Sequence, residues 1–401
     1  VTMFLVVAVL GTRWIATAAA VGPAALILWV IGFFALFVPL AFTVVELSSR
    51  YPQEGGLYVW TKRAFGEFPG FIAGWMYLAS NVSFFPSQLY FTAASALFLF
   101  GKPGHALATS VPYFVIASLA GLALALVLNV VGLRTGKWLH NAGAWGAWLP
   151  VGFLIGAGFV VCSRHGSATS FDLASLAPAA NLQNLLLCST IAFAFCGLEA
   201  ASFMGDEVKD ASRTIPRAIF FAGAIVTAVY VLGTLAVLVA IPRGEVSSLE
   251  GIMQAIERAA ARGGFPAVTP VAAFLTTIGG LGAVGAWLAA GGRLAFVTGV
   301  DRYLPASFGR VHPRWGTPHV ALMAQAAGAA CFAVLGQLGT SVRGAYEALI
   351  ALTAIAYFIP LMLMFAAMIA LQSEPGAARA VRVPGGRPVA VLHRLAVQHR
   401  A

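Results

Sequence analysis

Two apolar stretches of this sequence each contain a glycine close to a charged side chain: Gly11, Thr12 and Arg13 lie in one, and Gly197 and Glu199 in the other. Glycine weakens a helix, and an ionisable group in hydrocarbon costs roughly 2.5–3.5 kcal/mol or more. A helix interrupted at such a point leaves free amides at one end and free carbonyls at the other, which attract a carboxylate and an ammonium group respectively. These residues therefore predict a site for a small charged solute, and a zwitterion suits it best.

The composition places these stretches in a lipid bilayer. The chain has 401 residues, of which 60% are hydrophobic and 9% are charged, whereas soluble domains carry roughly 25% charged residues. Each spanning helix needs about 20 apolar residues, and the sequence contains ten such stretches. The sequence therefore predicts an all-α integral membrane protein with about ten transmembrane helices in a single domain over residues 1–371.

The ten expected spans form two halves, repeat one over residues 1–162 and repeat two over residues 187–371. A polar stretch at residues 163–183 separates the halves, and residues 372–401 are expected to be a basic cytoplasmic tail. The spans are expected at about residues 2–21, 24–46, 68–100, 111–133, 138–161, 189 onwards with a break near 197, 215–241, 268–297, 320–338 and 345–371.

An odd number of spans in each half puts the two halves into the membrane in opposite orientations. Each half also opens with an interrupted helix, and glycine-interrupted segments at corresponding positions of two halves are typical of a transporter's binding site. The expected fold is therefore a 5+5 inverted repeat with broken helices 1 and 6. We expect the site to lie between these breaks, with further contributions from the third, eighth and tenth spans.

The net charge of +10 is explained by orientation and indicates no nucleic-acid partner. Most of the 24 lysine and arginine residues fall in the loops after the second, fourth, sixth and eighth spans and in the tail. Cytoplasmic loops carry such an excess of positive charge. Both termini are therefore expected in the cytoplasm, with the lipid bilayer and a small-molecule substrate as the partners of this multi-pass protein.

Each charged residue at the breaks allows more than one interpretation. Arg13 contacts the substrate, reaches towards an interface, or pairs with Glu199. Glu199 contacts the substrate or accepts hydrogen bonds from backbone amides around its own break. Glu46 ends the second span and is either an anchor for the following loop or a gate residue.

Polar and aromatic residues elsewhere complete the set of candidates. Asn81 either satisfies the backbone of the third span, which Pro86 should bend, or lines the cavity. The aromatic residues Phe193, Phe195 and Tyr357 are mostly packing residues, although one of them is expected to cover the central site. Cys196 belongs to the second break.

Other chemistries are not indicated by the sequence. The four cysteines have no metal-ligand spacing and are expected to be small packing residues. No nucleophile elbow or phosphate-binding loop is found, and the histidines lie in or next to loops. We expect neither an enzyme nor a bound cofactor or metal.

Three stretches together are similar to one known family, over residues 1–388. They are VELSSRYPQEGGLYVWTKRAFGEFPGFIAGW after the second span, AFCGLEAASFMGDEVKDASRTIPRAI at the sixth, and GGRLAFVTGVDRYLPASFGRVHPRWGTP after the eighth. The sequence resembles the amino acid–polyamine–organocation superfamily of secondary transporters. The resemblance implies the leucine-transporter-like fold, alternating access, and transport of amino acids or amines. It also implies that Arg293 belongs to an intracellular gate.

Within the superfamily, VLGTRWIATAAAVGPAAL and YLASNVSFFP look like the bacterial glutamate/GABA antiporter branch. The chain departs from that pattern at Thr12, which precedes the arginine, and at Ala16, where a proline is common. Family members usually continue into two further helices beyond the tail, so the chain looks C-terminally short. The resemblance leaves the substrate, the coupling ion and the oligomeric state open.

The sequence thus predicts a secondary active transporter, a permease or antiporter, for an amino acid or related amine in the cytoplasmic membrane. One alternative is a polyamine carrier, which extra acidic residues in the cavity would favour. The other is a non-transporting sensor, or an inactive truncated member of the same family.

Overall fold

The computed structural model describes residues 10–372, apart from 52, 54, 179–181, 200, 201, 203–210 and 302. Within these residues the regular structure consists of helices and contains no strand. The all-α class predicted from composition is confirmed. Residues 373–401 of the predicted tail and the start of the first span lie outside the described residues.

Ten helical segments follow one another in the order predicted for the spans. The first half of the chain contains five segments. They are α2 (Thr12–Ala19), α3 (Ala24–Gly32) continued by the π-helix η1 (Phe33–Phe37) and α4 (Val38–Arg50), α6 (Glu67–Leu97), α8 (Val111–Val131) and α9 (Leu133–His165). The second half contains α11 (Leu182–Ala194), α12 (Ala211–Ala240), α14 (Val268–Val300), α15 (His319–Leu335) and α16 (Val342–Leu371).

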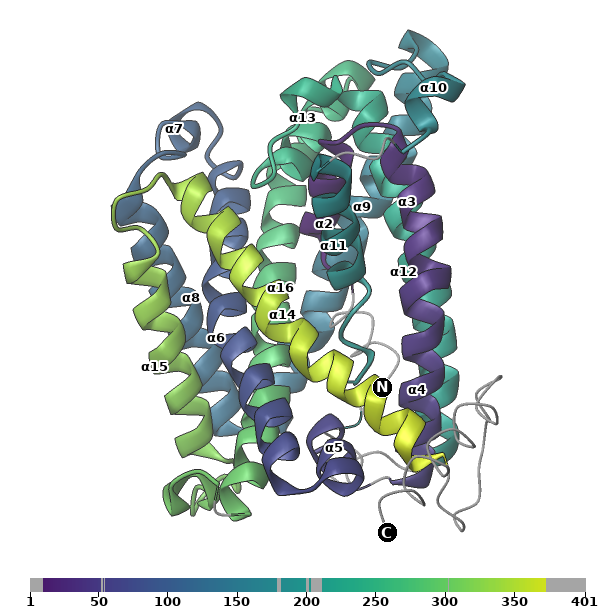
Figure 1. Ribbon diagram of the computed structural model, residues 1–401. Coiled ribbons are helices and arrows are strands. Elements are labelled where there is room, and N and C mark those ends of the chain that lie inside the picture. The colour runs from purple at the N-terminus through teal and green to yellow at the C-terminus, as the bar shows by residue number, and fades with distance from the viewer. Residues whose placement is uncertain are drawn as a thin grey trace.

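Short helices connect these segments at the two ends of the bundle. They are α5 (Leu57–Phe65), α7 (Lys102–His105), α10 (Leu173–Leu176), α13 (Gly251–Gly263) and the 3-10 turns η3 (Arg243–Glu245) and η4 (Ala306–Gly309). Figure 1 shows α7, α10 and α13 at one end of the bundle and α5 at the other.

Six of the described helices are long and apolar enough to cross a membrane, namely 24–50, 111–131, 141–165, 217–240, 268–299 and 342–371. α15 is apolar but shorter, and α6 is long but carries buried serine, threonine and asparagine residues. α2 and α11 are short because α2 begins at the first break and α11 ends at the second. The exposed surface of the long helices carries many large apolar side chains, as a helix facing lipid requires.

Two boundaries differ from those predicted, and glycine explains one of them. The basic run at residues 134–137 lies inside α9, because Gly132 adopts φ 112° and ends α8 directly before Leu133. α4 continues to Arg50, so Glu46 lies one turn inside the helix and not at its end.

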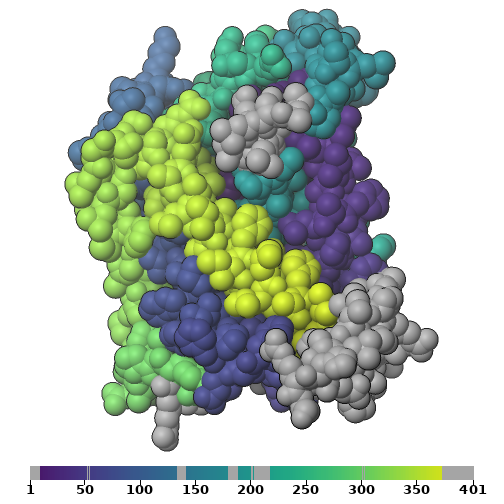
Figure 2. Space-filling view, viewed as in Figure 1, coloured from purple at the N-terminus to yellow at the C-terminus, as the bar shows by residue number. Residues whose placement is uncertain are grey.

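The interior of the bundle is organised around α6 and α14. α14 packs against α9 and α6, and α16 packs along α6. Figures 1 and 2 show α16 crossing one face of the molecule diagonally, in yellow, above α6. This arrangement brings the middles of α6, α14 and α16 close to the two broken helices.

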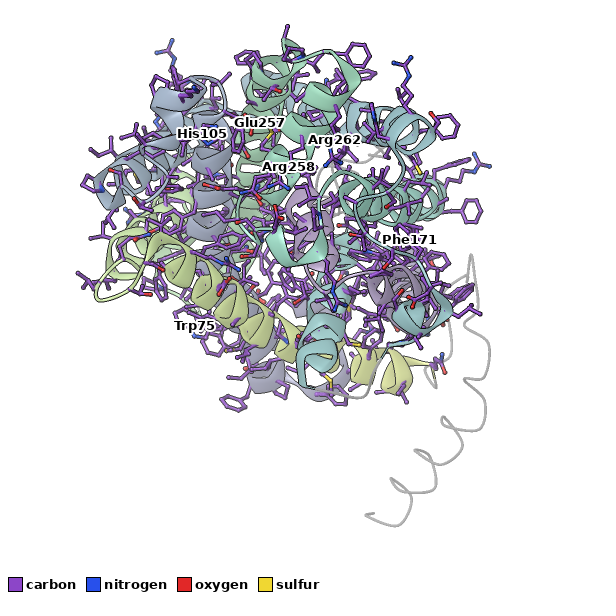
Figure 3. All side chains as sticks on the ribbon, turned by 90° about the horizontal axis from the view of Figure 1, so that it is seen from above. Trp75, His105, Phe171, Glu257, Arg258 and Arg262 are labelled. Atoms are coloured by element: carbon purple, nitrogen blue, oxygen red, sulfur yellow. The ribbon has the colours of Figure 1, made fainter. Side chains whose placement is uncertain are left out.

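α13 covers the end of the bundle opposite α5. Its apolar face, including Ile252 and Ile256, is fully buried, whereas the side chains of Glu257 and Arg258, labelled in Figure 3, are partly exposed. Arg258 pairs with Glu245 of η3 at 2.7 Å. α13 is therefore an amphipathic cap and does not cross the bundle.

Candidate functional site

The first break lies at Gly11. Gly11 has φ −86° and ψ 96°, which is extended backbone, and α2 begins at the next residue. The amide of Trp14 donates to the carbonyl of Gly11 at 3.0 Å. Because the first amides of a helix have no acceptor within it, the amides of Thr12 and Arg13 are left to bind another group.

The second break lies directly after α11, which ends at Ala194. The amide of Cys196 donates to the carbonyl of Phe193 at 3.0 Å, and Gly197 then turns the chain with φ 114°. A side chain would strain the backbone at that angle. The carbonyls of Phe195 and Cys196 follow the last helical bonds, so the negative end of α11 points into the break. A helix therefore begins at the first predicted break and another ends at the second, while residues 1–9 and 203–210 lie outside the described residues.

Tyr230 of α12 joins the two breaks. Its hydroxyl accepts a hydrogen bond from the amide of Gly11 at 3.1 Å and donates one to the carbonyl of Ala194 at 3.0 Å. Trp29 stacks on its ring at 4.3 Å between centroids. One side chain thus fixes the start of α2 relative to the end of α11.

We expect Tyr230→Phe to lower the stability of the protein by about 1–3 kcal/mol, because it leaves a buried amide and carbonyl without their partner. Uptake is expected to fall as well, since the breaks are no longer held together. The matched control is Tyr113→Phe, which removes a hydrogen bond of 2.8 Å to the carbonyl of Ala93. Thermal unfolding and uptake distinguish the two variants: equal uptake in both would contradict a role for Tyr230 at the breaks.

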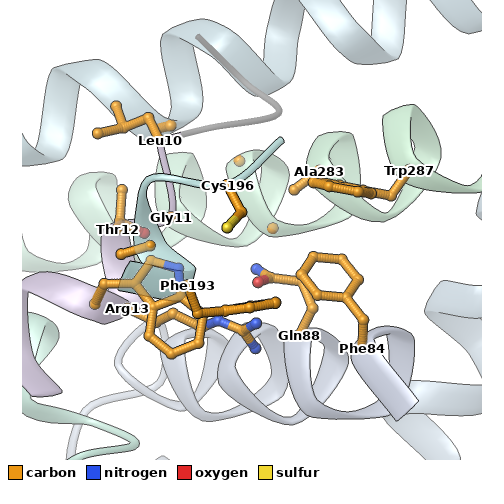
Figure 4. Close-up of a pocket in the computed structure, with 15 residues that line it drawn as sticks. Leu10, Gly11, Thr12, Arg13, Phe84, Gln88, Phe193, Cys196, Ala283 and Trp287 are labelled. Atoms are coloured by element: carbon orange, nitrogen blue, oxygen red, sulfur yellow. The ribbon is translucent and has the colours of Figure 1, made fainter. Parts of the chain in front are cut away.

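A cavity lies between the breaks and the middles of α6 and α14. Figure 4 shows it, with Leu10, Gly11 and Thr12 on one side and Ala283 and Trp287 on the other. The lining residues are Leu10, Gly11, Thr12, Arg13, Trp14, Phe84, Gln88, Ala147, Phe193, Ala194, Cys196, Gly279, Gly280, Ala283 and Trp287. None of these lining residues is acidic, and Arg13 is the one ionisable cation among them.

Arg13 is 1% exposed, so its charge is buried. The Nη1 atom donates to the hydroxyl of Ser87 at 3.0 Å. The rings of Trp14 and Phe84 lie 4.2 and 5.0 Å from the guanidinium carbon and attract the charge by cation–π interaction. The Nε and Nη2 atoms have no hydrogen-bond partner among the described residues.

Glu199 lies beside the cavity and not in its wall. Its carboxylate accepts hydrogen bonds from the amide of Gly197 at 3.1 Å, from the hydroxyl of Tyr77 at 3.2 Å and from the hydroxyl of Tyr357. Arg13 and Glu199 form no ion pair in the described part of the chain. This geometry matches the interpretation of Glu199 as an acceptor for an amide of its own break.

Aromatic rings separate the cavity from Glu199. Phe193 contacts Trp14 and Tyr357 edge to face, with centroids 5.5 and 5.2 Å apart. Trp287 contacts Phe84 at 5.3 Å and, on its other side, Tyr77 and Tyr357 at 6.3 and 6.4 Å. Of the aromatic residues singled out in the sequence, Phe193 is therefore the one in the cavity wall.

The structure brings some of the predicted site residues together and leaves others apart. Those in the cavity wall are Gly11, Thr12, Arg13, Phe193 and Cys196, whereas Gly197, Glu199 and Tyr357 form the layer behind it. A third group, Asn81, Glu46 and Arg293, lies elsewhere in α6, α4 and α14.

Asn81 points towards α14 and α15. A Cβ atom at Gly291 would lie 2.5 Å from Nδ2 of Asn81 and 2.3 Å from Oε1 of Gln325, so this glycine makes room for both amides. Glu46 is fully buried, 3.9 Å from Arg50, and Arg293 donates to the carbonyl of Ala289 at 3.1 Å.

A polar contact that the sequence did not indicate joins α5 to the end of α14. Nζ of Lys62 lies 2.7 Å from Oδ2 of Asp301, which also accepts a hydrogen bond of 2.5 Å from Tyr58. Burial alone would raise the pKa of Asp301, but the hydrogen bonds from Lys62 and Tyr58 lower it below 3.8. The hydrogen bond to Asp301 raises the pKa of Lys62 above 10.5.

We expect this contact to stabilise the protein by up to about 1 kcal/mol, since both side chains are partly exposed. The contribution is present at neutral pH. It is lost as the pH falls through the lowered pKa of Asp301, and again as it rises through the raised pKa of Lys62. Thermal unfolding of Lys62→Met, Asp301→Asn and the double variant measures the coupling. A coupling that is unchanged at a pH well below 3.8 would contradict the assignment.

Several residues of the site were not predicted from the sequence, including Ser87, Gln88, Trp287 and Tyr230. Ser87 and Gln88 follow Pro86 in a span that also carries other buried polar residues, and this polar pattern was a usable signal. Trp287 and Tyr230 have no such signal, because aromatic residues are common throughout these helices.

Comparison with known proteins identifies the family of the chain and its fold. A family model described as amino acid permease matches residues 1–392. An uncharacterized transporter of Legionella pneumophila is 30% identical to this chain, covering 97% of this chain and 84% of its own length.

Two relatives with more specific names match over shorter stretches. A glutamate/serine transporter of Bacillus subtilis is 28% identical over 75% of this chain. A probable agmatine/putrescine antiporter of Lactococcus lactis is 26% identical over 60% of this chain. The chain spans 57% and 51% of the lengths of these two relatives.

Among solved structures, MhsT in complex with L-phenylalanine superposes with a TM-score of 0.68 at 14% identity, covering 99% of this chain and 96% of that one. This likeness confirms the leucine-transporter-like fold expected from the two interrupted helices.

Proposed function

Because the chain belongs to the amino acid permease family, we propose that it moves an amino acid or a related amine across the cytoplasmic membrane by alternating access. The observation that carries the proposal is the cavity between the two helix breaks, where the start of α2, the end of α11 and a buried arginine come together. Catalysis of a chemical reaction is not part of the proposal, since the named relatives are transporters.

The backbone accounts for recognition of a zwitterion. The substrate carboxylate binds the amides of Thr12 and Arg13 at the positive end of α2. Its ammonium group binds the carbonyls of Phe195 and Cys196 at the negative end of α11. The carbonyls of Phe193 and Ala194 already accept hydrogen bonds from Cys196 and Tyr230. The ammonium group therefore binds the two carbonyls that follow them.

The surrounding layers suit a carrier that closes on its substrate. Phe193 and Trp287 in the cavity wall pack against Tyr357, whose hydroxyl binds Glu199. A movement of the segment after Gly197 therefore changes the wall of the cavity. Helices outside the cavity also shift in alternating access. Among them, α4 carries Glu46, α14 carries Arg293, and Lys62 of α5 contacts Asp301 at the end of α14.

The orientation follows from the charged loops. α5 and the turn η4 belong to the basic loops, and they lie at the end of the bundle opposite α13. We therefore place that end, and both termini, in the cytoplasm.

Uptake into proteoliposomes tests the proposal. Purified protein is reconstituted and supplied with labelled amino acids and polyamines, from outside or in exchange for the same compound trapped inside. Accumulation of at least one amino acid above protein-free vesicles is expected. Selective binding without accumulation or exchange would indicate a sensor instead, and selective accumulation of putrescine or agmatine would indicate a polyamine carrier.

A further inference from the structure

We propose that the substrate carries a second carboxylate, so that its net charge is negative, and that the side chain of Arg13 binds it. This inference rests on the proposed function and specifies the substrate class. The backbone ends of α2 and α11 already complement the two charges of a zwitterion. The guanidinium of Arg13 is a cation in excess of that requirement.

The free edge of Arg13 has the geometry for a carboxylate. Its two unpartnered nitrogens, Nε and Nη2, lie on the same edge of the planar guanidinium. That edge donates two parallel hydrogen bonds to a carboxylate. The rest of the guanidinium contacts the protein: Nη1 donates to the hydroxyl of Ser87, and the rings of Trp14 and Phe84 pack against its faces. The side chain is therefore held in place with one edge left to bind.

Among the described residues, no acidic side chain pairs with Arg13 or lines the cavity. The groups that act electrostatically on Arg13 are the hydroxyls of Tyr346 and Tyr230, which are neutral. The Tyr346 hydroxyl also interacts with the Arg13 side chain as a neutral hydrogen-bonding group. An unpaired charge is costly in a dry interior. An anionic substrate removes that cost when it binds.

Glu199 does not take this role. It receives three hydrogen bonds, from Gly197, Tyr77 and Tyr357, and it does not line the cavity. The polar side chains in the wall besides Arg13 are Thr12, Gln88 and Cys196. A cation entering the cavity would meet a guanidinium and find no carboxylate in the wall, so the same geometry disfavours agmatine and putrescine.

Glutamate and glutamine, or aspartate and asparagine, form matched pairs that differ in charge and hardly in shape. Their affinities are measured by competition for binding to the purified wild-type protein. We expect the dicarboxylic member of at least one pair to bind 10-fold or more tightly than its amide. This corresponds to the roughly 1.5–3 kcal/mol of a charged hydrogen bond.

A substitution at Arg13 tests whether this side chain causes the preference for the acid over its amide. Arg13→Gln is expected to bring the affinities of the acid and its amide to within about threefold, mainly by weakening the acid. The control Arg343→Gln, an exposed arginine paired with Glu347, is expected to keep the wild-type ratio.

The wild-type measurement needs no variant to fold, so it decides the inference by itself. Equal or tighter binding of the amides in both pairs would overturn the inference and leave the proposed amino acid transport intact. If only putrescine or agmatine binds, the inference and the amino acid assignment both fail. A preference for acids that survives in folded Arg13→Gln would overturn the role of Arg13.

Discussion

Arg13→Ala is expected to reduce uptake of the transported substrate by at least about 100-fold while the protein still inserts into the membrane. The variant removes the only cationic side chain in the described cavity wall. Loss of charge-assisted hydrogen bonds worth about 3 kcal/mol accounts for a factor of this size. Uptake into proteoliposomes at equal protein content measures it.

The effect must be separated from a loss of folding, because Arg13 is buried and contacts Ser87. Size-exclusion chromatography and thermal unfolding report on folding. Arg343→Ala removes an arginine of which 59% of the side chain is exposed, and it should transport normally. Uptake by folded Arg13→Ala within threefold of wild type would exclude the proposed contact.

Gly197→Ala is expected to produce a loss of uptake of similar size. Gly197 has φ 114°, where a residue with a Cβ atom is strained by roughly 1–3 kcal/mol. The amide of the same residue donates a hydrogen bond of 3.1 Å to the carboxylate of Glu199, so the strain also disturbs this contact. Because the turn also directs the carbonyls of Phe195 and Cys196, a shift there displaces the predicted ammonium site.

A matched glycine controls for backbone strain alone. Gly166 has φ 75°, follows the end of α9, and has open space around it. Gly166→Ala should therefore lower stability by a similar amount and leave uptake unchanged. If both alanine variants transport equally well, the second break has no special role in binding.

The sequence predicted the spans well because their signal is physical and local. In lipid, an apolar stretch of about 20 residues can satisfy its backbone hydrogen bonds only as a helix. A glycine close to a charged residue indicated the position of each break. Boundaries were less accurate where they depend on a single backbone angle, as at Gly132, or on a helix that continues past its last apolar residue, as at Glu46.

The site was only partly predictable, because hydropathy does not show which way a side chain points. Asn81 faces Gly291 and Gln325 instead of the cavity. Glu199 accepts hydrogen bonds from Tyr77 and Tyr357, which are distant from it in sequence, as well as from the nearby amide of Gly197. The link that Tyr230 makes between the breaks depends on how α12 packs, which the sequence does not encode locally.

The central claim is that the substrate is held between the two breaks. A structure determined with a transported amino acid bound tests it most directly. We predict ligand density between the amides of Thr12 and Arg13 and the carbonyls of Phe195 and Cys196, with a carboxylate at the free edge of Arg13. A ligand bound elsewhere, with this cavity left without it, would contradict the account.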